Sequence, residues 1–202
     1  MAMTSHMTLI PKTLSDDRTE PVAYERSIVF TDVVDSTSLV DRMGDECLLR
    51  VIVQHHRLAV ELGAELGCGH VASTGDGVFA VFEKADDAVE FARRMVAGVR
   101  QATVGGDCPA TRLHVGVASG PVHHWNGDFF GRTMHRAARI CRAARPNEIL
   151  VDADTVDAAV ETVDLIDDGR EVALRGFEAT ETIHQLGALE VSPAPKQLAA
   201  AG

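Results

Sequence analysis

Hydrophobic and polar positions along the chain change their period several times, and each change predicts a different element. Residues 27–33 read Ser-Ile-Val-Phe-Thr-Asp-Val, a nearly continuous apolar run that is typical of a buried strand. Asp35 and the hydroxyl residues after it supply capping chemistry for a long helix that follows. One face of this helix is predicted from positions that recur at steps of three and four: Leu48, Val51, Ile52, His55, Leu58, Ala59 and Leu62.

The middle of the chain predicts a hairpin, a second helix and another strand. Short strands near residues 69–73 and 78–82 are joined by a Gly-Asp-Gly step, which is a strong hairpin signal. A helix at residues 86–100 and a strand at residues 112–118 come next, and a turn at residues 119–121 ends that strand. The remaining predicted elements are a helix at 131–144 and short strands at 147–151, 162–167, 170–175 and 181–186.

The order of these elements predicts the class of fold. The strands are joined too closely for an all-parallel sheet, so the order favours an α+β fold with a ferredoxin-like split βαβ core. We expect a mixed, largely antiparallel sheet, helices packed on one face, and C-terminal strand additions. This domain is predicted at residues 26–187, between a flexible leader at 1–25 and a disordered tail at 188–202. The first seven residues resemble an expression-vector remnant rather than a secretion signal.

Composition excludes some partners and places the chain among globular proteins. Of 202 residues, 46% are hydrophobic and 24% are charged, which is ordinary for a globular domain. The net charge of −11 argues against nucleic-acid or anionic-membrane partners, which need basic patches. No apolar stretch approaches the ~20 residues that a membrane span requires, so no membrane insertion of this segment is expected. We predict a cytoplasmic location.

Cysteine and histidine usage gives no sign of a zinc site. The adjacent histidines at 55–56 and 123–124 point in different directions on a helix or strand, so we predict surface residues rather than shared metal ligands. The cysteines form no CxxC pair and are predicted to be reduced. They are Cys47, Cys68, Cys108 and Cys141.

Two acidic residues stand where a packed core would not favour them. Asp32 interrupts the first apolar strand, and Asp76 lies between two glycines at the hairpin turn. Taken alone, Asp76 could serve the turn and Asp32 could cap the following helix. If the strand and the hairpin are neighbours in one sheet, both carboxylates converge, and a buried carboxylate needs a partner. Two aspartates without imidazole suit Mg²⁺ or Mn²⁺ bound together with phosphate oxygens.

Four motifs in order resemble those of the class III adenylate and guanylate cyclase catalytic domain, of the bacterial type. Residues 30–37 read Phe-Thr-Asp-Val-Val-Asp-Ser-Thr, and residues 73–82 contain the Gly-Asp hairpin. Residues 127–140 end in Ala-Ala-Arg-Ile, and Leu-Arg-Gly at 174–176 precedes the last strand. The resemblance covers about residues 26–187. It implies an adenylate cyclase, a phosphorus-oxygen lyase that converts ATP into 3′,5′-cyclic AMP and pyrophosphate.

The resemblance also implies roles for residues at matching positions. Asp32 and Asp76 match the aspartates that bind two Mg²⁺ or Mn²⁺ ions, with the carbonyl of Val33 as an extra ligand. Backbone amides after the first strand should bind phosphate, and two arginines should stabilise phosphate charge, one of them in the transition state. The amides are those of Val34, Ser36 and Thr37, the transition-state arginine is Arg139, and Arg175 stands in place of a phosphate-binding lysine.

At the implied nucleotide site, one residue matches the family's base-reading position and three residues depart from the family pattern. Asp128 matches the residue that accepts a hydrogen bond from adenine N6 and repels guanine O6, which disfavours GTP. Ala72 replaces a purine-reading lysine, at a cost of roughly 1.5–3 kcal/mol. His135 replaces a ribose-positioning asparagine, and Asp35 adds a negative charge to the phosphate loop. The family builds each site from both subunits, which implies a homodimer with two shared active sites.

Other functions are left open at this point. Ala72 and His135 are also what a catalytically silent homologue would carry, one that acts as a dimeric nucleotide-binding or regulatory module. Without its motif, Arg139 would be read as an ordinary solvated arginine. A diguanylate synthase would need a different hairpin sequence, and a guanylate cyclase is disfavoured by Asp128. Asp32, Asp76 and Arg139 are present for the chemical step, whereas Ala72 weakens only the recognition of the base. We therefore expect weak or poorly selective ATP cyclisation.

Overall fold

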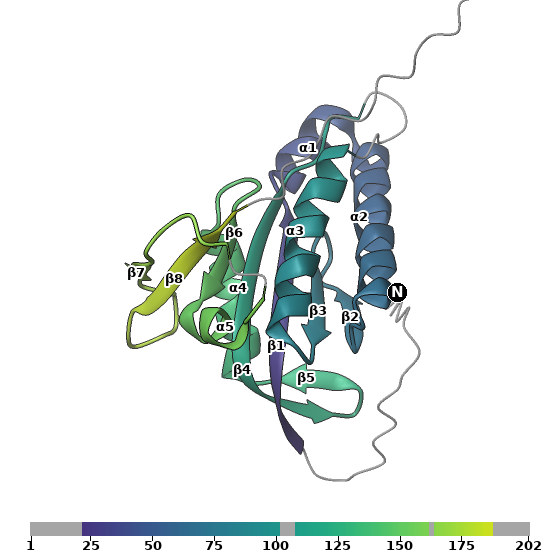
Figure 1. Ribbon diagram of the computed structural model, residues 1–202. Helices are drawn as coiled ribbons and strands as arrows, with labels where there is room; N and C mark the ends of the chain where they lie inside the picture. Colours follow the sequence, from purple (N-terminus) through teal and green to yellow (C-terminus); the bar gives the residue numbers. More distant parts are fainter. Residues whose placement is uncertain (1–21, 102–107, 162–163, 188–202) are drawn as a thin grey trace, which may run out of the picture.

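One sheet organises the described residues of the computed structural model, which are 22–101, 108–161 and 164–187 (Figure 1). Its strands are β1 (Val22–Val33), β2 (His70–Ser73), β3 (Val78–Phe82), β4 (Leu113–Trp125), β5 (Asp128–Phe130), β6 (Ile149–Asp152), β7 (Arg170–Val172) and β8 (Glu181–Leu186). The helices are α1 (Ser36–Met43), α2 (Asp45–Glu65), α3 (Ala85–Gln101), α4 (Arg132–Ala143) and α5 (Ala153–Ala158).

The strand order confirms the predicted fold class. The first four strands of the core lie in the order β2-β3-β1-β4 with antiparallel neighbours, which is the ferredoxin-like split βαβ arrangement. Beyond β4 the sheet continues with β6, β8 and β7, and β5 pairs with the end of β4. Among these strands only β4 and β6 are parallel, so the sheet is mixed and largely antiparallel.

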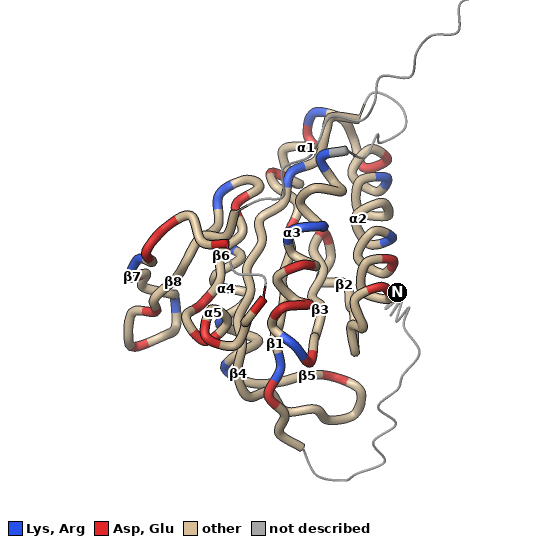
Figure 2. Tube along the Cα trace, in the orientation of Figure 1, with Lys and Arg blue, Asp and Glu red and all other residues tan. Residues whose placement is uncertain are grey.

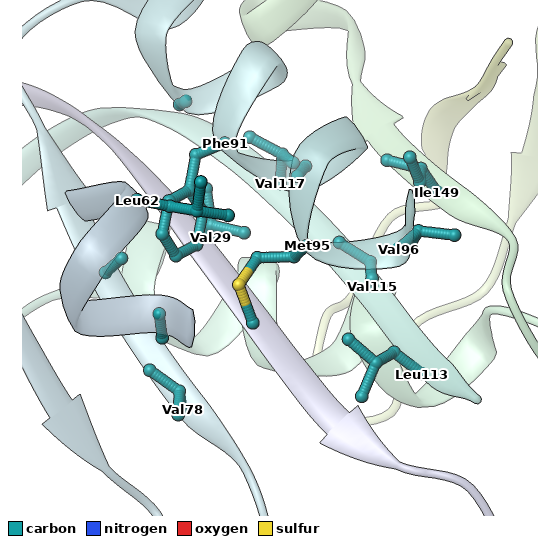
Figure 3. Packing of buried hydrophobic residues seen from close by; sticks show 14 of the residues in the cluster. Val29, Leu62, Val78, Phe91, Met95, Val96, Leu113, Val115, Val117 and Ile149 are labelled. Atoms are coloured by element: carbon teal, nitrogen blue, oxygen red, sulfur yellow. The ribbon is translucent and has the colours of Figure 1, made fainter. Parts of the chain in front are cut away.

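Both faces of the sheet are covered by helices. Alternation along β1 directs Val29 and Val33 to one face and Ile28 to the other. On the first face α2 and α3 pack side by side, and Phe91 and Met95 of α3 lie over the strands (Figures 1 and 3). On the second face α4 packs against β4 and β1. The prediction of helices on one face was therefore wrong for α4, because β1 carries apolar side chains on both of its faces.

Several predicted boundaries differ from the observed ones. Residues 22–25, expected in the leader, belong to β1 and pair with β4. Gly44 divides the predicted long helix into α1 and α2. β4 continues through the predicted turn, and Gly120 and Pro121 pair with β1. This part of β4 lies beyond its contact with β6 and forms a sheet edge there, where proline is tolerated. The rest of the expected leader and the tail lie outside the described residues.

The segment after β6 also differs from the prediction. It forms α5, whose first turn is capped by the Asp152 carboxylate accepting from the Thr155 amide at 2.9 Å. The strand predicted at 162–167 is reduced in the described residues to one bridge, between Leu165 and Leu186. Residues 162–163 lie outside the described part of the chain.

The cysteines do not all stay reduced. A disulfide joins Cys47, in the first turn of α2, to Cys108, which precedes β4, and their Cα atoms lie 5.8 Å apart. Cys68 and Cys141 are free and buried. The expectation of reduced thiols was therefore wrong for the first pair. These two positions are 61 residues apart in sequence and only the fold brings them together.

Charged residues are not concentrated in any one helix or strand of the described chain. Acidic and basic positions are interspersed along the described trace (Figure 2). In this described part, no helix has the length and apolar character needed to cross a membrane.

Candidate active site

Asp32 and Asp76 line one cavity of about 180 Å³ on the α4 side of the sheet. Asp32 is the penultimate residue of β1, and Asp76 lies in the turn between β2 and β3. Because Thr31 pairs with Val78, the hairpin turn lies beside the end of β1. Both carboxylates are half-buried. The fold thus brings together the two acidic residues that the sequence selected.

Gly77 allows the hairpin to approach β1 closely. A Cβ atom added at Gly77 would lie 2.5 Å from the carbonyl oxygen of Thr31 and 3.0 Å from Oδ1 of Asp32. No ordinary side chain tolerates the first of these contacts, so only glycine fits. The Thr74 amide donates to the Gly77 carbonyl at 2.9 Å and closes the turn. The turn that carries Asp76 is therefore seated directly on the segment that carries Asp32.

Burial and a neighbouring carboxylate both disfavour the ionised form of Asp32. Burial raises the pKa of Asp32 to about 6, and the charge of Asp76 and a hydrogen bond to it act in the same direction. A cation between the carboxylates would remove this repulsion, and such hard oxygen donors suit Mg²⁺ or Mn²⁺. Within the described residues, no three His, Cys, Asp or Glu side chains gather as a metal-binding group. The residues present thus fit a site of two carboxylates completed by backbone and phosphate oxygens.

Sequence reasoning missed two basic side chains near Asp32. His114 is the direct partner of Asp32 in the β1–β4 register, and its Nδ1 lies 2.6 Å from the carbonyl oxygen of Ala144 at the end of α4. Arg142 lines the cavity from α4. Both side chains lower the pKa of Asp32, against the larger effect of burial. Only the register of β1 with β4 makes His114 a neighbour of Asp32, and the sequence alone does not give that register.

The turn after β1 offers fewer free amides than predicted. The Val34 amide donates to the carbonyl oxygen of Arg112 at 3.0 Å, so it is already used, contrary to the prediction. Ser36 and Thr37 begin α1, and no side chain caps this end of the helix. Asp35 has a left-handed backbone (φ 54°) and its carboxylate lies 3.7 Å from Arg112, which explains why it is not a cap. Ser36 and Thr37 therefore present uncapped first-turn amides suited to an anion.

A close contact and polar bonds hold α4 on the sheet. A Cβ atom added at Gly116 of β4 would lie 2.2 Å from the backbone nitrogen of Cys141, so the helix rests directly on the strand. Arg136 donates to the carbonyl oxygen of Ser119 and to the carboxylate of Asp154, both at 2.7 Å. These contacts fix the direction in which the rest of α4 presents its side chains.

The other predicted site residues do not line the carboxylate cavity. His135, Asp128 and Arg175 are exposed, and Ala72 and Arg139 are half-buried. Within the described chain, Arg139 has no hydrogen-bond or ion-pair partner. None of these five residues lines the cavity that holds the two aspartates. The cavity of one chain therefore holds the predicted metal ligands but is not lined by the predicted base-reading and arginine positions.

The sheet order and the paired carboxylates fit the class of nucleotide cyclase catalytic domains. The chain belongs to the adenylate and guanylate cyclase catalytic domain family, whose model matches residues 19–187. This match confirms the resemblance that the four motifs indicated.

Relatives of known name support the same family. The chain is 32% identical over 136 residues to an adenylate cyclase of Streptomyces griseus, covering 67% of this chain and 33% of the relative. It is 30% identical over 148 residues to an adenylate cyclase of Streptomyces coelicolor, covering 73% and 38%. The chain thus spans about a third of the length of these relatives.

Solved structures share the fold. The adenylyl cyclase CyaB from P. aeruginosa superposes with a TM-score of 0.73 at 19% identity, covering 83% of this chain and 96% of that one. The guanylate cyclase domain of RhGC from Catenaria anguillulae, in complex with GTP, has a TM-score of 0.72 at 17% identity, covering 83% and 98%. At these identities the likeness concerns the fold alone.

Proposed function

We propose that this chain is an adenylate cyclase domain that converts ATP into 3′,5′-cyclic AMP and pyrophosphate. The observation that carries the proposal is the convergence of Asp32 and Asp76 in one cavity. The uncapped first turn of α1 follows Asp32 by four residues and adds an anion site beside it. The identity of about 30% to relatives named adenylate cyclase supports ATP as the substrate.

The residues around the cavity suit an in-line displacement at phosphorus. The ribose 3′-hydroxyl releases its proton to water and its oxygen bonds to the α-phosphorus, while the bond from that phosphorus to the pyrophosphate oxygen breaks. When bound, two Mg²⁺ or Mn²⁺ ions would lower the pKa of the 3′-hydroxyl and offset charge on the leaving pyrophosphate. Asp32, Asp76 and the carbonyl oxygen of Val33 would hold them. The amides of Ser36 and Thr37 would orient the triphosphate.

The arginines are assigned to a second copy of the chain. Arg139 is half-buried and unpaired in the described chain, so its charge is available to stabilise the negative charge that develops on the α-phosphate. Arg175, exposed between β7 and β8, would contact phosphate as a second cation. Because neither lines the carboxylate cavity of its own chain, we assign both to the partner's cavity in a two-fold homodimer with two equal sites.

Base selection rests on a reduced set of contacts. Asp128 would accept from adenine N6 and repel guanine O6. Ala72 has no donor for adenine, and His135 would orient the ribose with a ring N–H. We therefore expect ATP to be preferred over GTP, with weakened affinity.

A second candidate is a catalytically silent homologue that binds nucleotide as a dimer. The apolar side chain of Ala72, half-buried on β2, favours it, because the base would meet no donor there. This candidate predicts metal-dependent nucleotide binding without product.

The test is to incubate the full chain with ATP or GTP and Mn²⁺ or Mg²⁺ and to quantify cyclic product. Asp32→Ala removes one proposed ligand, and Asp41→Ala removes an exposed carboxylate on α1 as the matched control. We expect cyclic AMP from the wild-type chain and from the control but not from Asp32→Ala. No product from a folded, dimeric wild-type chain would refute the enzyme and favour the silent homologue. Faster turnover of GTP than of ATP would refute the role of Asp128.

A further inference from the structure

Two adjacent histidines of α2 contact the two segments that carry the aspartates. His55 Nε2 lies 2.8 Å from Oγ1 of Thr31, the residue before Asp32. His56 Nε2 lies 3.3 Å from the carbonyl oxygen of Gly77, the residue after Asp76, and donates to it. Neighbouring helix positions point about 100° apart, so one helix reaches both segments.

His55 differs from an ordinary core residue. Its side chain is 1% exposed on the helix face that packs on the sheet, as the apolar period predicted and contrary to the surface position expected for the pair of adjacent histidines. An apolar residue would bury there without the cost of desolvating an imidazole. The Thr31 hydroxyl also lies 3.4 Å from the carbonyl oxygen of Val78, so one hydroxyl of β1 contacts both His55 and β3. Besides this contact with Thr31, the ring lies close enough to the turn for the backbone and the charge of Asp76 to raise the pKa of His55, against the larger lowering by burial.

His56 holds the hairpin from the other side. Besides the Gly77 carbonyl, its Nε2 lies 3.5 Å from the hydroxyl of Ser73 at the end of β2. The turn already sits so close to Asp32 that a methyl group at Gly77 would not fit. A bond from α2 to that glycine's carbonyl therefore resists movement of the turn away from β1.

This arrangement opposes the repulsion between the two carboxylates. Like charges at the end of β1 and in the turn favour separation of these segments when no cation is bound. The separation of the carboxylates decides how well a small divalent cation binds. The bonds from α2 act on the residues directly adjoining each carboxylate, on the side of the sheet away from the cavity.

We propose that His55 and His56 are positioning residues that hold the Asp32 and Asp76 segments at the separation that a divalent cation requires. This inference rests on the proposed function, because it assumes that the two aspartates bind metal. Neither histidine contacts the metal or the substrate in this account.

The test measures Mn²⁺ binding to the full chain without nucleotide, from the electron paramagnetic resonance signal of free Mn²⁺. His55→Leu and His56→Leu should each weaken binding about fivefold to tenfold, the value of one hydrogen bond. His55→Gln, which keeps a donor near the Nε2 position, should restore most of the affinity. Val51→Ala, a buried change one turn earlier on the same helix face, is the matched control and should lower stability without changing Mn²⁺ affinity.

A double-mutant cycle identifies the bond itself. Thr31→Val removes the hydroxyl, and its effect on Mn²⁺ affinity should be almost absent in a His55→Leu background. Wild-type affinity in both leucine variants, or an equal loss in Val51→Ala, would overturn the inference. If His55→Leu does not fold, the half-buried His56→Leu decides the outcome by the same criteria. Wild-type binding that Asp32→Ala leaves unchanged would instead refute the metal site of the proposed function.

Discussion

Replacing Asp32 by asparagine should stabilise the metal-free chain while removing its response to metal. The pKa of Asp32 is about 6 against an ordinary value of 3.8, mainly because of burial and then because of the charge of Asp76. One pKa unit corresponds to about 1.36 kcal/mol, so the ionised carboxylate costs the folded chain at most about 3 kcal/mol. Solvent in the cavity screens part of this cost, so we expect Asp32→Asn to raise the free energy of unfolding by about 1–2 kcal/mol at pH 8.

The pH dependence follows from the direction of the shift. An acid with a raised pKa binds its proton more tightly in the folded state, so the folded chain holds an extra proton between about pH 4 and pH 6. The stability that Asp32 contributes is therefore complete below about pH 4 and is lost as the pH rises through about 6. The advantage of Asp32→Asn should accordingly shrink between pH 8 and pH 5.

Urea unfolding followed by circular dichroism, in EDTA and then in saturating Mn²⁺, measures both effects. Asp41→Asn is the control, because it removes the same charge from an exposed position on α1. In Mn²⁺ the order should reverse, since only the wild-type chain and the control gain the free energy of metal binding. If Asp32→Asn is no more stable than Asp41→Asn in EDTA, the two carboxylates are not crowded and the reasoning is wrong.

Three further changes test other parts of the account. Ala72→Lys restores a donor for adenine and should lower the KM for ATP about tenfold or more, and an unchanged KM would show that the base does not reach β2. Gly77→Ala places a methyl group 2.5 Å from the Thr31 carbonyl oxygen, so it should displace the turn. Mn²⁺ binding, measured by electron paramagnetic resonance, should weaken at least about tenfold. Unaltered binding would contradict this. Gly116→Ala should lower the free energy of unfolding by about 1–3 kcal/mol in a urea titration, because α4 rests on that backbone, and a neutral result would mean that the helix has room to shift.

The core of the fold was predictable because its elements have clear periods and short connections. The convergence of Asp32 and Asp76 followed from one assumption, that the first strand lies beside the hairpin, and the pairing of β1 with β3 confirms it. The position of α4 was not predictable in the same way. An apolar run such as residues 28–30 does not say whether one face or both faces of the strand are covered.

Features that depend on register or on distant contacts escaped the sequence. His114 becomes a neighbour of Asp32 only through the pairing of β1 with β4. The bond from His55 to Thr31 joins residues 24 positions apart, and the disulfide from Cys47 to Cys108 joins residues 61 apart. Periodicity placed His55 correctly on the apolar face of its helix, but residue type suggested the surface. The hydrogen-bonding contact with Thr31 explains how the polar ring of His55 is accommodated on that buried face.

The central claim is that each site combines the carboxylates of one chain with Arg139 of another. It is tested by purifying a heterodimer of Asp32→Ala and Arg139→Ala chains that carry different affinity tags. Each homodimer should be inactive, whereas one of the two sites in the heterodimer is intact, so it should form cyclic AMP at about half the wild-type rate. A heterodimer as inactive as either parent, with all three species folded and dimeric, would contradict the shared site.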